Sequence, residues 1–217
     1  MQRIVKPEIL DSLDENDPAA IHNRRDIRLF NRLMGTFRWF TRQVSTLIQE
    51  EDRMLEIGAG WGDLGYCLNK RVLAKKGLAL DGLDVCSRPE KWPKGWLWHQ
   101  ADLRAFKKYG DYHFVLANLV LHQFEDDELR ALGAVLQEST RVLIVNEPAR
   151  RAFHKFQVKG AKLLGSNYVT DHDALVSVEA GFLGDELPNL LGFDPKQWNW
   201  RCTAGILGHY RMVAIRR

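Results

Sequence analysis

Residues 53–65 read Arg-Met-Leu-Glu-Ile-Gly-Ala-Gly-Trp-Gly-Asp-Leu-Gly, and this stretch decides the fold. Its first half is apolar, like a buried strand, and three glycines then occupy alternate positions, Gly58, Gly60 and Gly62. Glycine turns the chain through conformations closed to other residues and lets a ligand approach the backbone. A strand that feeds such a loop into a helix N-terminus predicts a crevice for a nucleotide-like ligand at the carboxyl edge of a sheet.

The composition is that of an ordinary globular protein. The chain has 217 residues, of which 45% are hydrophobic and 27% charged, which suits one domain with a full-sized core. No apolar run approaches the ~20 residues that span a bilayer. The first residues lack a signal-peptide core, so we expect a cytoplasmic protein without a membrane partner. The net charge of +3 and the spacing of the three cysteines predict neither nucleic-acid binding nor a zinc or redox site.

Strand-like and helical patterns alternate after the glycine loop. Further strands are expected at Leu78–Val85, Trp96–Ala101, Phe114–Leu121 and Val142–Val145. Such alternation predicts an α/β domain with a parallel sheet. The last two strand-like runs, Trp198–Ala204 and His209–Ile215, are separated by only four residues. Because that link is too short for a parallel crossover, we expect an antiparallel hairpin there.

The N-terminal quarter is expected to form a helical cap. Residues 1–16 lack a pattern and are interpreted as a partly ordered arm. Asp17 and Pro18 form a typical helix start, and Gly35 divides two amphipathic helices. We therefore divide the chain into an arm and cap over residues 1–50 and a ligand-binding domain over residues 51–217.

A helical insert is expected at about residues 149–185 of the second part. Arg150–Leu164 looks helical, and Thr170-Asp171 is predicted to cap a further helix. His172 and Asp173 are interpreted as capping residues of that helix.

Two ligands compete for the glycine loop. Gly60 to Gly65 matches G-x-G-x-x-G, and Asp84 follows about 20 residues later, as in dinucleotide-binding domains. An NAD-dependent oxidoreductase is therefore one interpretation. Glu56 to Gly62, however, resembles the first motif of class I S-adenosylmethionine-dependent methyltransferases, in which an acidic residue precedes G-x-G-x-G. S-adenosylmethionine has no pyrophosphate but carries a cationic sulfonium and an amino group, which suit a carboxylate at the strand end.

This resemblance implies a three-layer Rossmann-like fold with a mostly parallel, seven-stranded sheet, an antiparallel last strand and an N-terminal helical cap. It implies that Asp84 binds the ribose hydroxyls and that Asp102 accepts from the adenine amino group. Residues 29–39 also resemble, more loosely, the helical entry of quinone- and polyketide-type small-molecule methyltransferases. The residues expected to bind S-adenosylmethionine are Glu56, Gly58, Ala59, Gly60, Trp61, Gly62, Asp84, Val85, Asp102, Leu103 and Asn118.

The resemblance places the methyl-transfer point beside Leu116–Phe124. This segment lacks the Asn-Pro-Pro-Tyr or Asp-Pro-Pro-Tyr pattern of base-amino methyltransferases, which argues against an adenine or glutamine target. Asn118 is a poor ligand for hard cations, so no metal is expected. His122 is the candidate general base, and its alternative is a histidine that hydrogen-bonds backbone or lines the pocket. Glu147 is a second catalytic candidate, and its alternative is a salt bridge to a nearby arginine, Arg150 or Arg151.

Two further features have open interpretations. Trp61 either covers the cofactor or packs beneath the N-terminal helices. Arg24, Arg25, Arg28 and Arg32 either line an anionic group or form a solvated helix face.

The sequence as a whole predicts an S-adenosylmethionine-dependent methyltransferase. We expect methyl transfer to an oxygen, rather than nitrogen or carbon, of a small-molecule acceptor, and an aromatic or polyketide-like molecule would suit the aromatic content. The protein is expected to be a monomer or homodimer, and nucleic acid is not expected as a partner. The alternatives are the NAD-dependent oxidoreductase and a non-catalytic binding protein with the methyltransferase fold.

Overall fold

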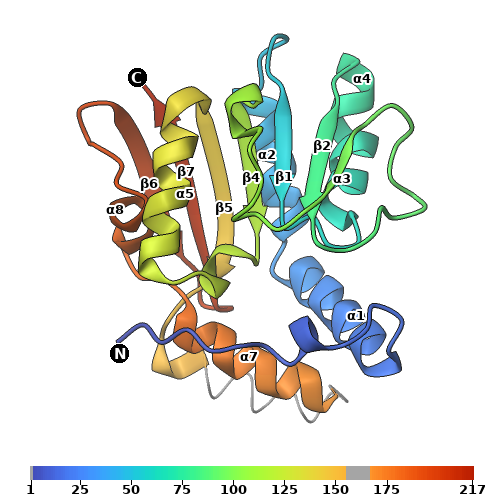
Figure 1. The fold of residues 1–217 in the computed structure, drawn as a ribbon. Helices are drawn as coiled ribbons and strands as arrows, with labels where there is room; N and C mark the ends of the chain where they lie inside the picture. Colours follow the sequence, from blue (N-terminus) through green and yellow to red (C-terminus); the bar gives the residue numbers. More distant parts are fainter. Residues whose placement is uncertain (1, 155–166) are drawn as a thin grey trace.

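A seven-stranded sheet forms the centre of the molecule, seen in a computed structural model that describes residues 2–154 and 167–217 (Figure 1). The strand order is β3-β2-β1-β4-β5-β7-β6. Strands β1 to β5 run parallel to one another, whereas β7 is antiparallel to both β5 and β6. The strands are β1 (Met54–Ile57), β2 (Leu80–Asp84), β3 (Trp98–Gln100), β4 (Phe114–Asn118), β5 (Val142–Pro148), β6 (Trp198–Ala204) and β7 (His209–Arg216).

Helices cover both faces of the sheet. Among the described residues, the helices of four or more residues are α1 (Pro18–Leu33), α2 (Thr36–Leu47), α3 (Asp63–Leu68), α5 (Asp126–Ser139), α7 (Tyr168–Ala180) and α8 (Glu186–Leu190), with a π-helical turn at Asn69–Leu73. Leu55 and Ile57 of β1 belong to one apolar cluster with α5 and α8, whereas Met54 belongs to a second cluster with α2 and α3. The alternation of β1 side chains thus separates two cores, and the domain has three layers.

The expected hairpin and parallel sheet are confirmed. Trp198–Ala204 pairs antiparallel with β7, and β7 inserts beside β5. Strand β4 was expected to reach Leu121 but ends at Asn118. The reason is local, because Leu119 adopts a φ of 58°, which no extended strand accommodates.

The N-terminal cap begins as predicted. The Asp17 side chain accepts a hydrogen bond from the Ala19 amide at 2.7 Å, and Pro18 is the first residue of α1. Gly35 takes the left-handed conformation between α1 and α2. Figure 1 shows α1, α7 and the N-terminal arm (residues 2–16) below the carboxyl ends of the parallel strands. The cap therefore lies over the edge of the sheet where the glycine loop emerges.

The insert differs from its prediction. Asn167, not Thr170-Asp171, caps α7, because its side-chain oxygen accepts from the Thr170 amide at 2.9 Å. Asp173 does not cap the helix either: it accepts from the backbone amides of Ile9 and Leu10. Most of the helix expected at Arg150–Leu164 lies outside the described residues. In the part of the chain that is described, no helix has the length and apolar character needed to cross a membrane.

Candidate functional site

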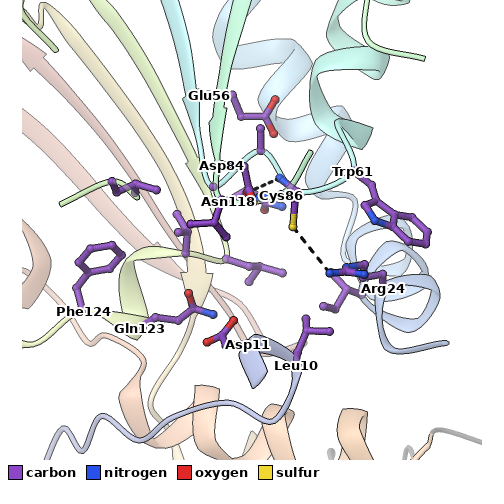
Figure 2. Close-up of a pocket in the computed structure, with 18 of the residues that line it drawn as sticks. Leu10, Asp11, Arg24, Glu56, Trp61, Asp84, Cys86, Asn118, Gln123 and Phe124 are labelled. Atoms are coloured by element: carbon purple, nitrogen blue, oxygen red, sulfur yellow. Dashed lines mark hydrogen bonds between the residues drawn. The ribbon is translucent and has the colours of Figure 1, made fainter. Parts of the chain in front are cut away.

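A pocket of about 920 Å³ opens at the carboxyl ends of β1, β2 and β4 (Figure 2). It lies where parallel α/β sheets bind nucleotide-like ligands. All but one of the residues expected to bind a cofactor line it, namely Glu56, Gly58, Ala59, Gly60, Trp61, Asp84, Val85, Asp102, Leu103 and Asn118. The exception is Gly62, which lies behind the loop at the start of α3, where an added Cβ would come within 2.7 Å of the Trp92 ring.

The structure explains why glycine occurs at the first two positions of the loop, Gly58 and Gly60. Gly58 has a φ of 65°, and a Cβ added there would lie 2.5 Å from a methyl group of Val120. Gly60 has a φ of 53° with open space around it, and its amide donates to Asp84 Oδ2 at 2.7 Å. Gly58 therefore allows the loop to pass close to the segment after β4, and Gly60 ties the loop to the end of β2.

Glu56 is the most unusual group in the pocket. Its side chain is buried at the end of β1, and Oε2 has no hydrogen-bond partner among the described residues. Burial raises the pKa of Glu56 well above its ordinary value, and the nearby carboxylates of Asp63 and Asp84 raise it further. A buried carboxyl group of this kind is stabilised by a cationic or hydrogen-bond-donating ligand.

The other polar side chains expected to bind the cofactor differ in how much of their hydrogen-bonding capacity is already used within the protein. Both oxygens of Asp84 accept from backbone amides, of Gly60 and Cys86, but a carboxylate keeps further lone pairs for ligand hydroxyls. Asp102 is exposed and accepts from the Arg104 amide at 2.8 Å. Asn118 Oδ1 accepts from the side-chain amide of Asn146 at 2.9 Å. The carboxylates at the ends of β2 and β3 thus face the pocket with acceptor capacity left.

Trp61 lies between the first pocket and α1. It lines the pocket, and it also packs beneath α1, because the guanidinium groups of Arg24 and Arg28 lie 5.3 Å and 5.8 Å from its ring. Arg28 also pairs with Asp63 at 2.8 Å. Figure 2 shows Arg24 reaching past Trp61 toward the sulfur of Cys86. These cation–π contacts hold the cap against the glycine loop.

A second pocket, of about 300 Å³, adjoins the first beneath the cap. The two share Ile27, Asn31 and Leu119 as lining residues. Apolar side chains from α1, α7 and the β6–β7 hairpin line it together with polar ones such as Asn23, Thr170 and His209. Leu119, with its positive φ, stands at the junction, and strain of this kind concentrates at functional sites.

His122 and Glu147, the two catalytic candidates, lie together in the wall of the second pocket. Glu147 is fully buried, and its carboxylate accepts from the backbone amides of Val120 and Leu121 at 3.0 Å and 2.8 Å. His122 Nδ1 lies 2.6 Å from Glu147 Oε2, and His122 Nε2 lies 3.1 Å from Oε1 of Glu8. The expected salt bridge from Glu147 to Arg150 is absent among the described contacts, where Arg150 pairs with Glu186.

This network fixes the protonation of His122. Burial lowers the pKa of the imidazole, but the hydrogen bonds to Glu147 and Glu8 outweigh it and raise the pKa to about 10. With a carboxylate on each ring nitrogen, both nitrogens carry protons at neutral pH. A protonated imidazole has no lone pair with which to remove a proton, so the geometry does not support the general-base role expected of His122.

Sequence reasoning missed the contribution of the arm. Arg3, Glu8 and Asp11 contact or line the site, although residues 1–16 showed no pattern. Burial raises the pKa of Asp11 to about 6, and the carboxylates of Glu8 and Asp173 add to the effect. No periodicity marks these residues because the groups that Arg3 and Glu8 contact lie more than 100 residues away in the chain.

The fold was compared with known proteins. No family model and no curated protein matches the sequence. The plantazolicin methyltransferase BpumL, solved with a triazolic desmethylPZN analog and SAH (S-adenosylhomocysteine), has a TM-score of 0.72 and 12% identity over 96% of this chain and 93% of its own. BamL, solved with the same class of ligands, has a TM-score of 0.70 and 10% identity over 95% and 92%.

A third structure shows the same architecture. The methyltransferase domain of bacterial CtHen1-C has a TM-score of 0.58 and 17% identity over 83% of this chain and 96% of its own. At such identities the likeness concerns the fold. It agrees with the strand order and the antiparallel β7 described above. The chain therefore has the same three-layer, Rossmann-like fold as these solved methyltransferase structures.

Proposed function

We propose that the protein is an S-adenosylmethionine-dependent methyltransferase. The observation that carries the proposal is Glu56, a buried carboxyl group at the end of β1 whose Oε2 has no partner among the described residues. A ligand with a cationic sulfonium and an amino group would stabilise it. The pyrophosphate of NAD would instead place negative charge beside the carboxylates of Glu56 and Asp84, which disfavours the oxidoreductase alternative.

The pocket residues then take separate roles. When bound, S-adenosylmethionine supplies a methyl group on a positively charged sulfur. Glu56 favours the cationic part of the ligand, Asp84 accepts from ribose hydroxyls, and Asp102 accepts from the adenine amino group. Leu103 adds apolar contact, and Asn118 lines the side of the pocket nearest the junction with the second pocket. These assignments are the ones that the resemblance to methyltransferases implies, and the presence of each side chain in the pocket wall supports them.

The second pocket is the proposed site of the methyl acceptor. Its walls combine apolar and polar side chains, and two buried polar atoms, Asn23 Oδ1 and His209 Nδ1, have no partner among the described residues. Burial lowers the pKa of His209 to about 4, so its ring is neutral at pH 7. The methyl acceptor is accordingly a small molecule with an apolar body and hydrogen-bonding groups. In our preferred interpretation it is methylated on oxygen. Catalysis rests on positioning, because a sulfonium is already an activated methyl donor.

The test of the function is a calorimetric titration of the purified protein with S-adenosylmethionine and SAH. Binding of SAH with a Kd in the micromolar range or tighter would support the proposal, and no heat of binding for either ligand would overturn it. Titration with NAD in parallel tests the oxidoreductase. Transfer of a labelled methyl group to at least one member of an acceptor library distinguishes the enzyme from a non-catalytic protein with the same fold.

Glu56→Gln is expected to move affinity and stability in opposite directions. Losing a charge-assisted contact of about 1.5–3 kcal/mol weakens SAH binding about 10- to 100-fold. Without ligand the variant gains stability at pH 7, because a carboxyl whose pKa is raised by folding destabilises the fold progressively as the pH rises above its ordinary value.

Calorimetry and thermal unfolding check the two effects. Glu51→Gln, an exposed carboxylate just before β1, is the matched control and should change neither. Unchanged SAH affinity in Glu56→Gln would remove Glu56 from the site.

A further inference from the structure

The N-terminal arm forms part of the wall of both pockets. Val5, Leu10, Asp11 and Leu13 line the first pocket, and Glu8 lines the second. Figure 1 shows the arm running beside α7 and below the sheet before it turns into α1, and Figure 2 shows Leu10 and Asp11 facing the strand ends across the pocket. Whatever holds the arm in place therefore shapes the two pockets together.

Glu8 anchors the arm through three side-chain contacts. Its side chain is 9% exposed. Besides His122 Nε2 at 3.1 Å, its carboxylate accepts from Gln123 Nε2 at 2.9 Å and from the hydroxyl of Ser177. The partners come from the segment after β4 and from α7. One carboxylate thus joins the arm, the sheet edge and the helical insert.

The remaining tethers surround this contact. Arg3 donates to the carbonyl oxygens of His122 and Phe124 at 3.1 Å and 2.6 Å. Asp173 of α7 accepts from the amides of Ile9 and Leu10 at 2.8 Å and 3.0 Å. An exposed ion pair between Lys6 and Glu179 adds a tether that does not reach either catalytic candidate.

We propose that Glu8 is a positioning residue, which latches the N-terminal arm onto the His122 imidazole and so completes the cofactor pocket and the acceptor pocket together. The inference rests on the proposed function, because the latch is assigned to a site that holds cofactor and acceptor. His122 then acts as the fixed cation of the latch, anchored from behind by Glu147. In this role both ring nitrogens of His122 carry a proton, whereas a general base would need one nitrogen without a proton.

The charges around the latch give it a pH dependence. Glu147 of β5 and Glu8 of the arm face His122 directly, the Arg3 guanidinium lies on its carbonyl, and Asp11 and Asp173 lie nearby. Docking raises the pKa of His122, so this contribution to the latch is complete below the ordinary pKa of 6.5 and declines as the pH rises toward about 10.

The ionisation of Glu8 sets the lower limit of the pH range in which the latch holds. Burial raises the pKa of Glu8, but the hydrogen bond and charge of His122 outweigh this and leave it lowered. The latch is therefore also lost as the pH falls through that lowered pKa.

The test compares Glu8→Gln with Glu179→Gln, which removes the exposed tether of the same arm by the same chemical change. In the absence of ligand, hydrogen–deuterium exchange should show faster exchange of the Ile9 and Leu10 amides in Glu8→Gln, with α1 unchanged as the internal reference. SAH should dissociate about 10-fold faster from this variant in stopped flow, as expected for loss of a charge-assisted hydrogen bond. Glu179→Gln should behave like the wild type in both measurements.

The pH profile distinguishes a latch from a general loss of stability. In the wild type the SAH dissociation rate should rise between about pH 7 and pH 9.5, whereas in Glu8→Gln it should be fast and nearly flat. Equal dissociation rates and equal amide exchange in Glu8→Gln and the wild type would overturn the latch. Absence of SAH binding to the wild type would instead overturn the proposed function, and the amide exchange would still report on the arm.

Discussion

Replacing Gly58 with alanine is expected to weaken SAH binding by more than about 100-fold and to destabilise the fold by about 2–5 kcal/mol. The backbone of Gly58 is left-handed, with a φ of 65°. The added Cβ would lie 2.5 Å from Val120 Cγ2 and 2.6 Å from Val120 Cβ. Because a Cβ is fixed to its backbone, the loop and the segment after β4 must move apart, and both line the cofactor pocket.

Gly77→Ala is the matched control for this variant. Gly77 has nearly the same φ, 67°, but no atom lies within 4 Å of an added Cβ, and it does not line either pocket. This variant should lose only about 1 kcal/mol of folding stability, from the conformational strain of alanine at a positive φ, and it should keep normal SAH binding. Thermal unfolding and calorimetry measure the two effects. An affinity of Gly58→Ala within 10-fold of the wild type would contradict the close packing of Gly58 on Val120.

Glu147→Gln is expected to cost about 3–5 kcal/mol of folding stability, the range found when one partner of a buried ion pair is removed. The glutamine keeps the shape of the side chain. One of its two terminal atoms, however, becomes an NH₂ group, which cannot accept from the backbone amides or from His122. A protonated imidazole is then left with Glu8 as its remaining carboxylate. For a chain of this size the loss corresponds to roughly 10 °C in Tm.

The control for Glu147 is Glu138→Gln on α5, an exposed carboxylate that should shift stability by less than about 0.5 kcal/mol. Chemical denaturation of the two variants at pH 7 makes the comparison. A loss below about 1 kcal/mol for Glu147→Gln would show that the buried carboxylate and the His122 cation do not depend on each other.

The fold could be predicted because its signals are local. The glycine loop, the acidic strand ends and the four-residue link before β7 each lie within a few residues, and each has one structural solution. Asp17 and Gly35 likewise define the cap through their own backbone conformations. The cofactor pocket follows from this, because parallel strands bring Glu56, Asp84 and Asp102 to one edge of the sheet.

The acceptor side could not be predicted in the same way. His122 was selected for its ordinary pKa, but its environment depends on Glu8 and Glu147, which lie in other elements. Gly62 matched the motif, yet its missing side chain accommodates Trp92 rather than a ligand. In each case the deciding neighbour is distant in sequence, and a pattern read along the chain does not contain it.

The latch between Glu8 and His122 has a consequence for the order in which parts of the protein fold during synthesis. Glu8 is 114 residues from His122 and 169 residues from Ser177. On the ribosome the arm is made before His122 and Ser177, and α7 is among the later helices of the described residues. Loops of that length close late, because their ends must first be brought together. The crevice at the glycine loop needs only residues 53–84 and the strands beside them. In a nascent chain this crevice can therefore form well before the N-terminal arm closes over it.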